Sequence, residues 1–141
     1  MAEIVAINRG DDRRRPRESQ EDSPAEYEVD PEKRLVVVRF TGHVTVQKIA
    51  EYVAHLRMHP AFHPSFGEIA DLREVREIEL QTDDFLRLAD KIDPFFAEAK
   101  RAFVVRTTVQ NHAARMHKIL RPKRNTEIFE SFEQAERWVR G

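Results

Sequence analysis

Acidic, basic and hydroxyl side chains follow two of the apolar runs in this sequence. Asp71 and Arg73 come directly after the run in GEIADLREVREIEL, and Arg106 and Thr107 follow the run in AFVVRT. If both runs are parallel strands of one sheet, their carboxyl ends meet at one edge, where ligands commonly bind. A guanidinium there could hold a carboxylate or a phosphate, and a helix starting after Thr107 offers N–H groups to an anion.

We therefore predict a ligand-binding site for a small anion, formed by Asp71, Arg73, Arg106 and Thr107. The alternative interpretation needs no ligand: Asp71 forms a structural ion pair with Arg73 or Arg106, and Thr107 is an ordinary helix cap. Both interpretations use the same residue types, so the sequence leaves the choice open.

Two adjacent phenylalanines, Phe95 and Phe96, lie in the segment DPFFAEAK. Neighbouring residues of a helix cannot both face the same side. Together with Phe62 and Phe66 of the preceding loop they could form an apolar lid over a pocket, which adds Phe95 and Phe96 to the predicted ligand site. The alternative is that each ring packs separately into the edge of the core, as most aromatic side chains do.

A basic stretch, HAARMHKILRPKR, contains no acidic residue. Its arginines and lysines are Arg115, Lys118, Arg121, Lys123 and Arg124. Residues 68–84 hold seven acids and two arginines, so the surface is predicted to be dipolar. The basic stretch could dock onto an anionic headgroup, a nucleic acid or an acidic partner, or it could be a solvated helix end that complements the helix dipole.

The sequence contains no arrangement of residues that is typical of an enzyme. His55, His59 and His63 are spaced by four, but Pro60 takes His63 out of the helix and there is no HExxH motif, so no metal is expected. There is no cysteine, no GxSxG motif and, with four glycines, no glycine-rich phosphate loop. We expect a non-catalytic protein without a cofactor.

Composition points to a single domain of a water-soluble chain. The chain has 141 residues, of which 40% are hydrophobic and 35% charged, with a net charge of −1. A balanced charge provides no global field for nucleic acid or anionic membranes, so no specific nucleic-acid binding is expected. No run approaches the roughly 20 apolar residues of a membrane helix. We expect a cytoplasmic protein, with peripheral membrane contact as the one membrane role left open.

Residues 1–25 are predicted to form a disordered, charged tail, and residues 26–141 the domain. Asn8–Pro24 mixes both charges with turn-forming residues and cannot bury enough apolar surface to offset chain ordering. The exception is Glu3–Ile7, a short apolar run that could pair as an additional edge strand.

The domain opens with a predicted hairpin, in which PEK joins YEVD to RLVVVRFT. Gly42 is expected to end the second strand, and Thr45 to cap a helix from about Val46 to His59. A strand follows near Gly67–Asp71.

Thr82 is expected to cap a second helix, which buries Phe85, Leu88, Ala89 and Ile92. AFVVRT is then a buried strand, and TEIFE is the last strand. Thr107 with Gln110, and Ser131 with Gln134, have the spacing of capping boxes for two further helices.

This alternation predicts an α/β fold with a layered, mostly parallel sheet of about five strands, an N-terminal antiparallel hairpin and four helices. The order of elements, with RLVVVRFTG, IADLR, AFVVRT and HAARMHKIL, resembles the stage II sporulation protein AA-like branch of the STAS domains, whose fold is shared in outline with Sec14-type lipid carriers. The resemblance covers about residues 26–141. It implies a domain without catalytic machinery, and relatives that bind small amphipathic ligands or associate with membranes.

The resemblance also implies a phosphorylation switch in signalling members, at a Ser or Thr just after the third strand. Here Asp71 is followed by Leu72, Arg73, Glu74 and Val75, and no hydroxyl occurs before Thr82. A phosphorylation switch at this point is therefore not expected.

The functional prediction is a STAS-like binding module for a small amphipathic or anionic ligand, or for a membrane surface. The alternative is a regulatory protein-interaction domain that docks through residues 71–79 without the switch. Homodimerisation through oppositely charged faces is left open.

Overall fold

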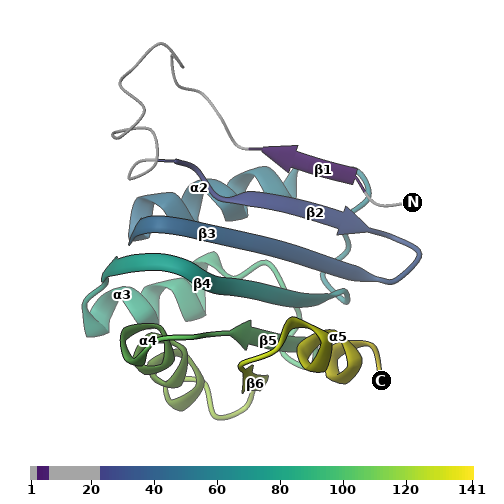
Figure 1. Cartoon of the computed structure of the whole chain (residues 1–141). Coiled ribbons are helices and arrows are strands. Elements are labelled where there is room, and N and C mark those ends of the chain that lie inside the picture. The colour runs from purple at the N-terminus through teal and green to yellow at the C-terminus, as the bar shows by residue number, and fades with distance from the viewer. Residues whose placement is uncertain (1–2, 7–22) are drawn as a thin grey trace.

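The computed structural model describes residues 3–6, by their backbone, and residues 23–141, except the side chains of residues 89 and 90. Its six-stranded sheet has the strands in chain order (Figure 1). The strands are β1 (Glu3–Ala6), β2 (Glu26–Asp30), β3 (Leu35–Thr45), β4 (Gly67–Glu79), β5 (Lys100–Val104) and β6 (Asn125–Phe129). β1, β2 and β3 pair antiparallel, and β3 to β6 pair parallel.

The predicted α/β class, mostly parallel sheet and N-terminal hairpin are confirmed. The described residues also contain the helices α2 (Val46–Arg57), α3 (Thr82–Arg87), α4 (Thr108–Ile119) and α5 (Phe132–Arg140), with a π-helical turn, η1 (Leu88–Ile92), continuing α3. The sheet has one strand more than expected, because Glu3–Ala6 pairs with β2. The predicted disordered tail falls mainly on residues 7–22, which lie outside the described residues.

Strands β3 and β4 are longer than the sequence predicted. Gly42 was expected to end β3, and β4 was expected to end near Asp71, but β3 continues to Thr45 and β4 to Glu79. Gly42 has φ 65°, a conformation that glycine adopts readily, and the register shifts on both sides of it. The two strands continue to pair with each other past the residues that pair with β2 and β5. Burial of Val44 and Val75 stabilises this extension.

Each face of the sheet packs against different helices. Ala70 and Leu72 of β4 face the larger core, which includes Tyr52 of α2 and Ala114 of α4. Ile69 of β4 faces a smaller core, covered by side chains of α5. Figure 1 shows α2 behind the sheet and α5 in front of it. This alternation is what a strand buried on both faces requires.

Polar caps begin the helices largely where the sequence indicated. Thr45, Thr107 and Ser131 each accept a hydrogen bond from the backbone N–H three residues on, at 3.2, 3.2 and 3.3 Å. The prediction that Thr82 caps α3 is wrong: Gln81 is the cap residue, because the Asp84 carboxylate accepts the Gln81 N–H at 2.8 Å and starts the helix one residue earlier.

Candidate functional site

A cavity of about 100 Å³, partly open to solvent, lies between the sheet and helices α2, α3 and α4. Its walls are mainly apolar. They include Phe40, Val44, Ile49, Val53, Ala70, Leu72, Ile78, Leu80, Phe85, Leu88, Ile92, Phe103, Ala113 and Ala114. The polar residues that also border it gather where β4 and β5 begin, so the cavity has one charged end and an otherwise hydrocarbon lining.

The charged end starts from two side chains that face each other across neighbouring strands. Glu68 of β4 and Arg101 of β5 are in register, and both are buried. Glu68 Oε1 accepts hydrogen bonds from Arg101 Nε at 2.8 Å and Nη2 at 2.7 Å. The Tyr52 hydroxyl donates to Glu68 Oε2 at 2.6 Å, and burial followed by the Glu68 charge raises the pKa of Tyr52 well above its ordinary value.

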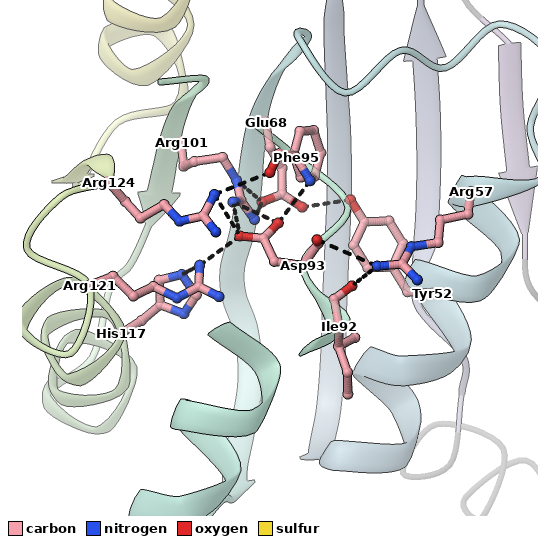
Figure 2. Close-up of polar contacts among 10 residues, drawn as sticks. All are labelled: Tyr52, Arg57, Glu68, Ile92, Asp93, Phe95, Arg101, His117, Arg121 and Arg124. Carbon is pink, nitrogen blue, oxygen red and sulfur yellow. Dashed lines mark hydrogen bonds and ion pairs between the residues drawn. The ribbon is translucent and has the colours of Figure 1, made fainter. Parts of the chain in front are cut away.

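Asp93 is the carboxylate on which three guanidinium groups converge (Figure 2). Arg101 Nη1 reaches its two oxygens at 3.1 and 2.9 Å, and Arg121 Nη1 reaches Oδ2 at 2.8 Å. Arg124 Nη1 lies 3.5 Å from Oδ2. Burial alone would raise the pKa of Asp93, but Arg101 and then the hydrogen bond from the Phe95 N–H outweigh it, and the pKa is lowered.

Arg121 also contacts His117, and the pair borders the cavity. Arg121 Nη1 lies 2.9 Å from His117 Nε2, which must accept this hydrogen bond because a guanidinium only donates. Burial, and then the charges of Arg121 and Arg101, hold the pKa of His117 well below its ordinary value. The imidazole is therefore neutral near pH 7, with its proton on Nδ1.

Arg121 keeps unused hydrogen-bonding capacity inside the protein. Its side chain is 4% exposed, and within the part of the chain that the structure describes its Nε and Nη2 have no acceptor. Buried polar groups without partners are rare in folded proteins and each requires an explanation. This residue is the most unusual feature of the candidate site.

The residues predicted to form a strand-end site do come together, at the opposite end of β5. Asp71 is paired by Arg73, with Nε at 3.0 Å and Nη2 at 2.9 Å from its oxygens. Burial raises the pKa of Asp71, but hydrogen bonds from Arg73 lower it by more. Arg106 pairs with Glu74 at 2.9 Å instead of Asp71, and Thr107 caps α4 while Gln110 Oε1 accepts its N–H.

This strand-end cluster does not belong to the cavity. Asp71 is in register with Val104, which packs on the α5 side of the sheet, whereas the cavity lies on the other side. Arg73, Arg106 and Thr107 instead border a separate open groove. The contacts of Asp71 and Thr107 are those of the ion-pair and helix-cap interpretation, and ligand binding there stays a prediction.

Phe95 and Phe96 diverge, as adjacent residues must. Phe95 is buried, with the Arg101 guanidinium 4.2 Å from its ring centroid and Phe62 at 5.2 Å. Phe96 is 46% exposed, beside His63. Neither phenylalanine borders the cavity, so these two residues do not form the expected lid over it.

One residue of the expected docking surface on the basic stretch, Arg121, is not at the surface. Arg121 is buried, because α4 ends at Ile119 and the chain turns so that the Arg121 N–H bonds to Lys118 O. The predicted placement of Arg121 on an anion-docking surface is therefore wrong. Arg124 also turns toward Asp93, and Lys118 pairs with Glu127 at 2.9 Å. Arg115, Lys118 and Lys123 remain exposed.

Sequence reasoning missed most of the charged end of the cavity. Asp93, the first residue of DPFFAEAK, was not among the predicted site residues; it also accepts the Phe95 N–H at 3.0 Å. Glu68 and Arg101 were not singled out at all. A charged residue at the start of each of two neighbouring buried strands was the available signal, since such charges are rarely buried without partners.

The described residues offer neither a metal site nor a membrane-spanning helix. Among them no group of three or more His, Asp or Glu side chains could hold a metal ion. No helix in that part of the chain is long and apolar enough to cross a membrane.

Comparison with known proteins identifies the fold. No protein-family model and no curated protein matches this chain. The crystal structure of an uncharacterized DUF3478-family protein with a SpoIIAA-like fold, from Shewanella loihica PV-4, aligns over 99% of this chain and 95% of its own, with 19% identity and a TM-score of 0.53. The chain therefore has a SpoIIAA-like fold, as the sequence resemblance implied.

Proposed function

We propose that this protein is a non-catalytic binding module that holds a small amphipathic ligand in this cavity. The observation that carries the proposal is the buried Arg121, which is one of the residues that border the cavity and which has two nitrogens without acceptors among the described residues. Ligand pockets typically combine apolar walls with a few polar groups that fix the orientation of the ligand. The cavity has this composition.

The contacts of the buried acids support a binding role over catalysis. Glu68 and Asp93 are both held by Arg101, so neither is poised to take a proton from a substrate. Ser65 Oγ lies 2.8 Å from His63 Nδ1, but that nitrogen also accepts the Ser65 N–H, and Arg34 donates to the hydroxyl at 2.6 Å. This pair is an exposed local turn.

The test is to fill the cavity. Ala113→Leu places a larger side chain in its wall, and His112→Leu adds the same side chain to the exposed face of α4 as a matched control. Native and then denaturing mass spectrometry of each purified protein would detect a co-purifying molecule. Binding of benzyl alcohol, followed by ligand-observed NMR, would test capacity directly.

We expect Ala113→Leu to lose the bound mass and the benzyl alcohol signal, while His112→Leu keeps both. If Ala113→Leu stays folded and binds as the wild type does, the cavity is not the binding site. The membrane-surface form of the hypothesis has weaker support, because Arg121 is buried and Lys118 is already paired.

A second candidate function, docking of a regulatory protein, is supported by the end of β4 beyond Arg73 and Val75, whose carbonyls accept hydrogen bonds from Gln110 of α4. Pairing between β4 and β5 ends at Asp71, so within the described residues β4 continues to Glu79 with β3 as its only strand neighbour. An exposed strand edge can pair with a strand of a partner. Charge reversal at Glu77, which is exposed on this edge, should abolish capture of such a partner; capture that survives it would count against this role.

A further inference from the structure

The unused donors of Arg121 have a defined number and geometry. A guanidinium carries five N–H groups. The two on Nη1 are taken by Asp93 Oδ2 at 2.8 Å and His117 Nε2 at 2.9 Å. The N–H of Nε and the two of Nη2 have no acceptor among the described residues. Nε and Nη2 lie along one edge of the planar guanidinium. Their N–H groups can donate in parallel to the two oxygens of a carboxylate.

The charge of the surrounding cluster sets the charge of the ligand. The cations Arg101, Arg121 and Arg124 face the carboxylates of Asp93 and Glu68, which leaves one positive charge unbalanced. His117 and Tyr52 add none near pH 7, because burial holds both in their neutral forms. Burial lowers the pKa of Arg121 even though Asp93 opposes this, as expected for a cation that is incompletely compensated. A monoanion would complete the balance, and a dianion would reverse it.

The volume of the cavity limits the size of the apolar part of a ligand. Its volume of about 100 Å³ is smaller than the roughly 150 Å³ of a dry protein cavity that accepts benzene. A group smaller than benzene therefore fits wholly inside, and a chain or ring of about six heavy atoms fits with part of it at the open side of the cavity.

We infer that the ligand is a small monocarboxylic acid, whose carboxylate binds Nε and Nη2 of Arg121 and whose short aliphatic or aromatic group fills the apolar cavity. This inference rests on the proposed binding function and narrows it to a chemical class. The carboxylate would supply the missing acceptors and the missing negative charge together.

The experiment compares three ligands that each contain six carbons in a linear chain, titrated calorimetrically into the wild-type protein: sodium hexanoate, 1-hexanol and hexyl phosphate. Hexanoate should bind at least about tenfold more tightly than 1-hexanol, because hydrogen bonds to a charged group are about twice as strong as neutral ones. It should also bind more tightly than hexyl phosphate. In ¹⁵N-resolved NMR spectra, hexanoate should shift the Nε–H signal of Arg121.

Arg121→Met tests the assignment to this residue, with Arg115→Met as the matched control on the exposed surface of α4. Asp93 keeps Arg101 and Arg124 as partners in the first variant, so the fold has support without Arg121. Arg121→Met should lower hexanoate affinity to that of 1-hexanol, and Arg115→Met should leave it unchanged. If Arg121→Met does not fold, the three-ligand comparison on the wild type decides alone.

The outcomes separate this inference from the proposed function. Equal binding of 1-hexanol and hexanoate, or tighter binding of hexyl phosphate, overturns the monocarboxylate inference while the binding module stands. If none of the three ligands binds and benzyl alcohol does not bind either, both the inference and the proposed function fall.

Discussion

Asp93 organises the polar end of the cavity through its contacts with Arg101, Arg121 and Arg124. A carboxylate in this setting is held ionised by its partners despite burial, and those partners are kept from repelling one another by the same carboxylate. His117 lies at the edge of this cluster and is neutral, because an added proton would meet the positive charges of Arg121 and Arg101.

Acidification should therefore destabilise the protein through His117. Its pKa in the folded chain is below the ordinary value of 6.5, so the unfolded chain binds more protons once the pH falls below 6.5. The contribution of His117 to the free energy of unfolding is fully present above that pH. It decreases as the pH falls toward the pKa of His117 in the folded chain, with a slope that approaches about 1.4 kcal/mol per pH unit. Asp93 affects the free energy of unfolding only at lower pH, because its pKa is lowered from the ordinary value of 3.8.

His117→Gln should flatten this part of the profile, measured by urea unfolding at several values between pH 5 and 7. His112→Gln on the exposed face of α4 serves as control and should keep the wild-type slope. An unchanged slope in His117→Gln would mean that other groups carry the dependence.

At the scale of elements, the sequence predicted how helix α4 begins but not how it contacts β4. The spacing of Thr107 and Gln110 predicted a capping box, and the structure has one. The spacing did not predict that the amide of Gln110 also donates to Arg73 O at 3.2 Å and Val75 O at 2.8 Å. That contact depends on β4 continuing past Asp71, which the sequence pattern did not reveal.

Gln110 should accordingly contribute more to stability than a cap residue. It is fully buried, and its side chain satisfies backbone groups of both α4 and β4. Gln110→Ala should cost about 2–3 kcal/mol or more, since each buried group left without a partner costs about 1–3 kcal/mol. Gln134→Ala, the same change at an exposed position of α5, should stay within about 0.5 kcal/mol.

Chemical denaturation of both variants would measure this difference. Equal effects of the two substitutions would show that the contacts between α4 and β4 add nothing beyond the helix cap.

The extension of β4 itself was missed because Gly42 in β3 normally marks the end of a strand, whereas here a register shift with φ 65° lets the pairing continue.

At the scale of the whole molecule, the order of elements was predictable and the cavity was not. Apolar runs and capping residues report on short stretches of chain, and they were sufficient for the α/β class and the parallel sheet. The cavity depends on how Phe85 and Leu88 meet Ala113 and Ala114 across separate helices. Arg121 could not be placed for the same reason, because its partner Asp93 lies 28 positions earlier in the chain.

Hydrostatic pressure should detect the same cavity. Unfolding removes internal voids and so reduces the volume of the system, typically by about 20–100 mL/mol, and compression favours the unfolded chain in proportion. We expect Ala113→Leu to raise the pressure midpoint of unfolding, monitored by Trp138 fluorescence, and His112→Leu to leave it unchanged. A midpoint that does not rise in Ala113→Leu would mean that the void contributes little to the volume change. The space that would receive a ligand is thus also expected to make the empty protein more sensitive to pressure.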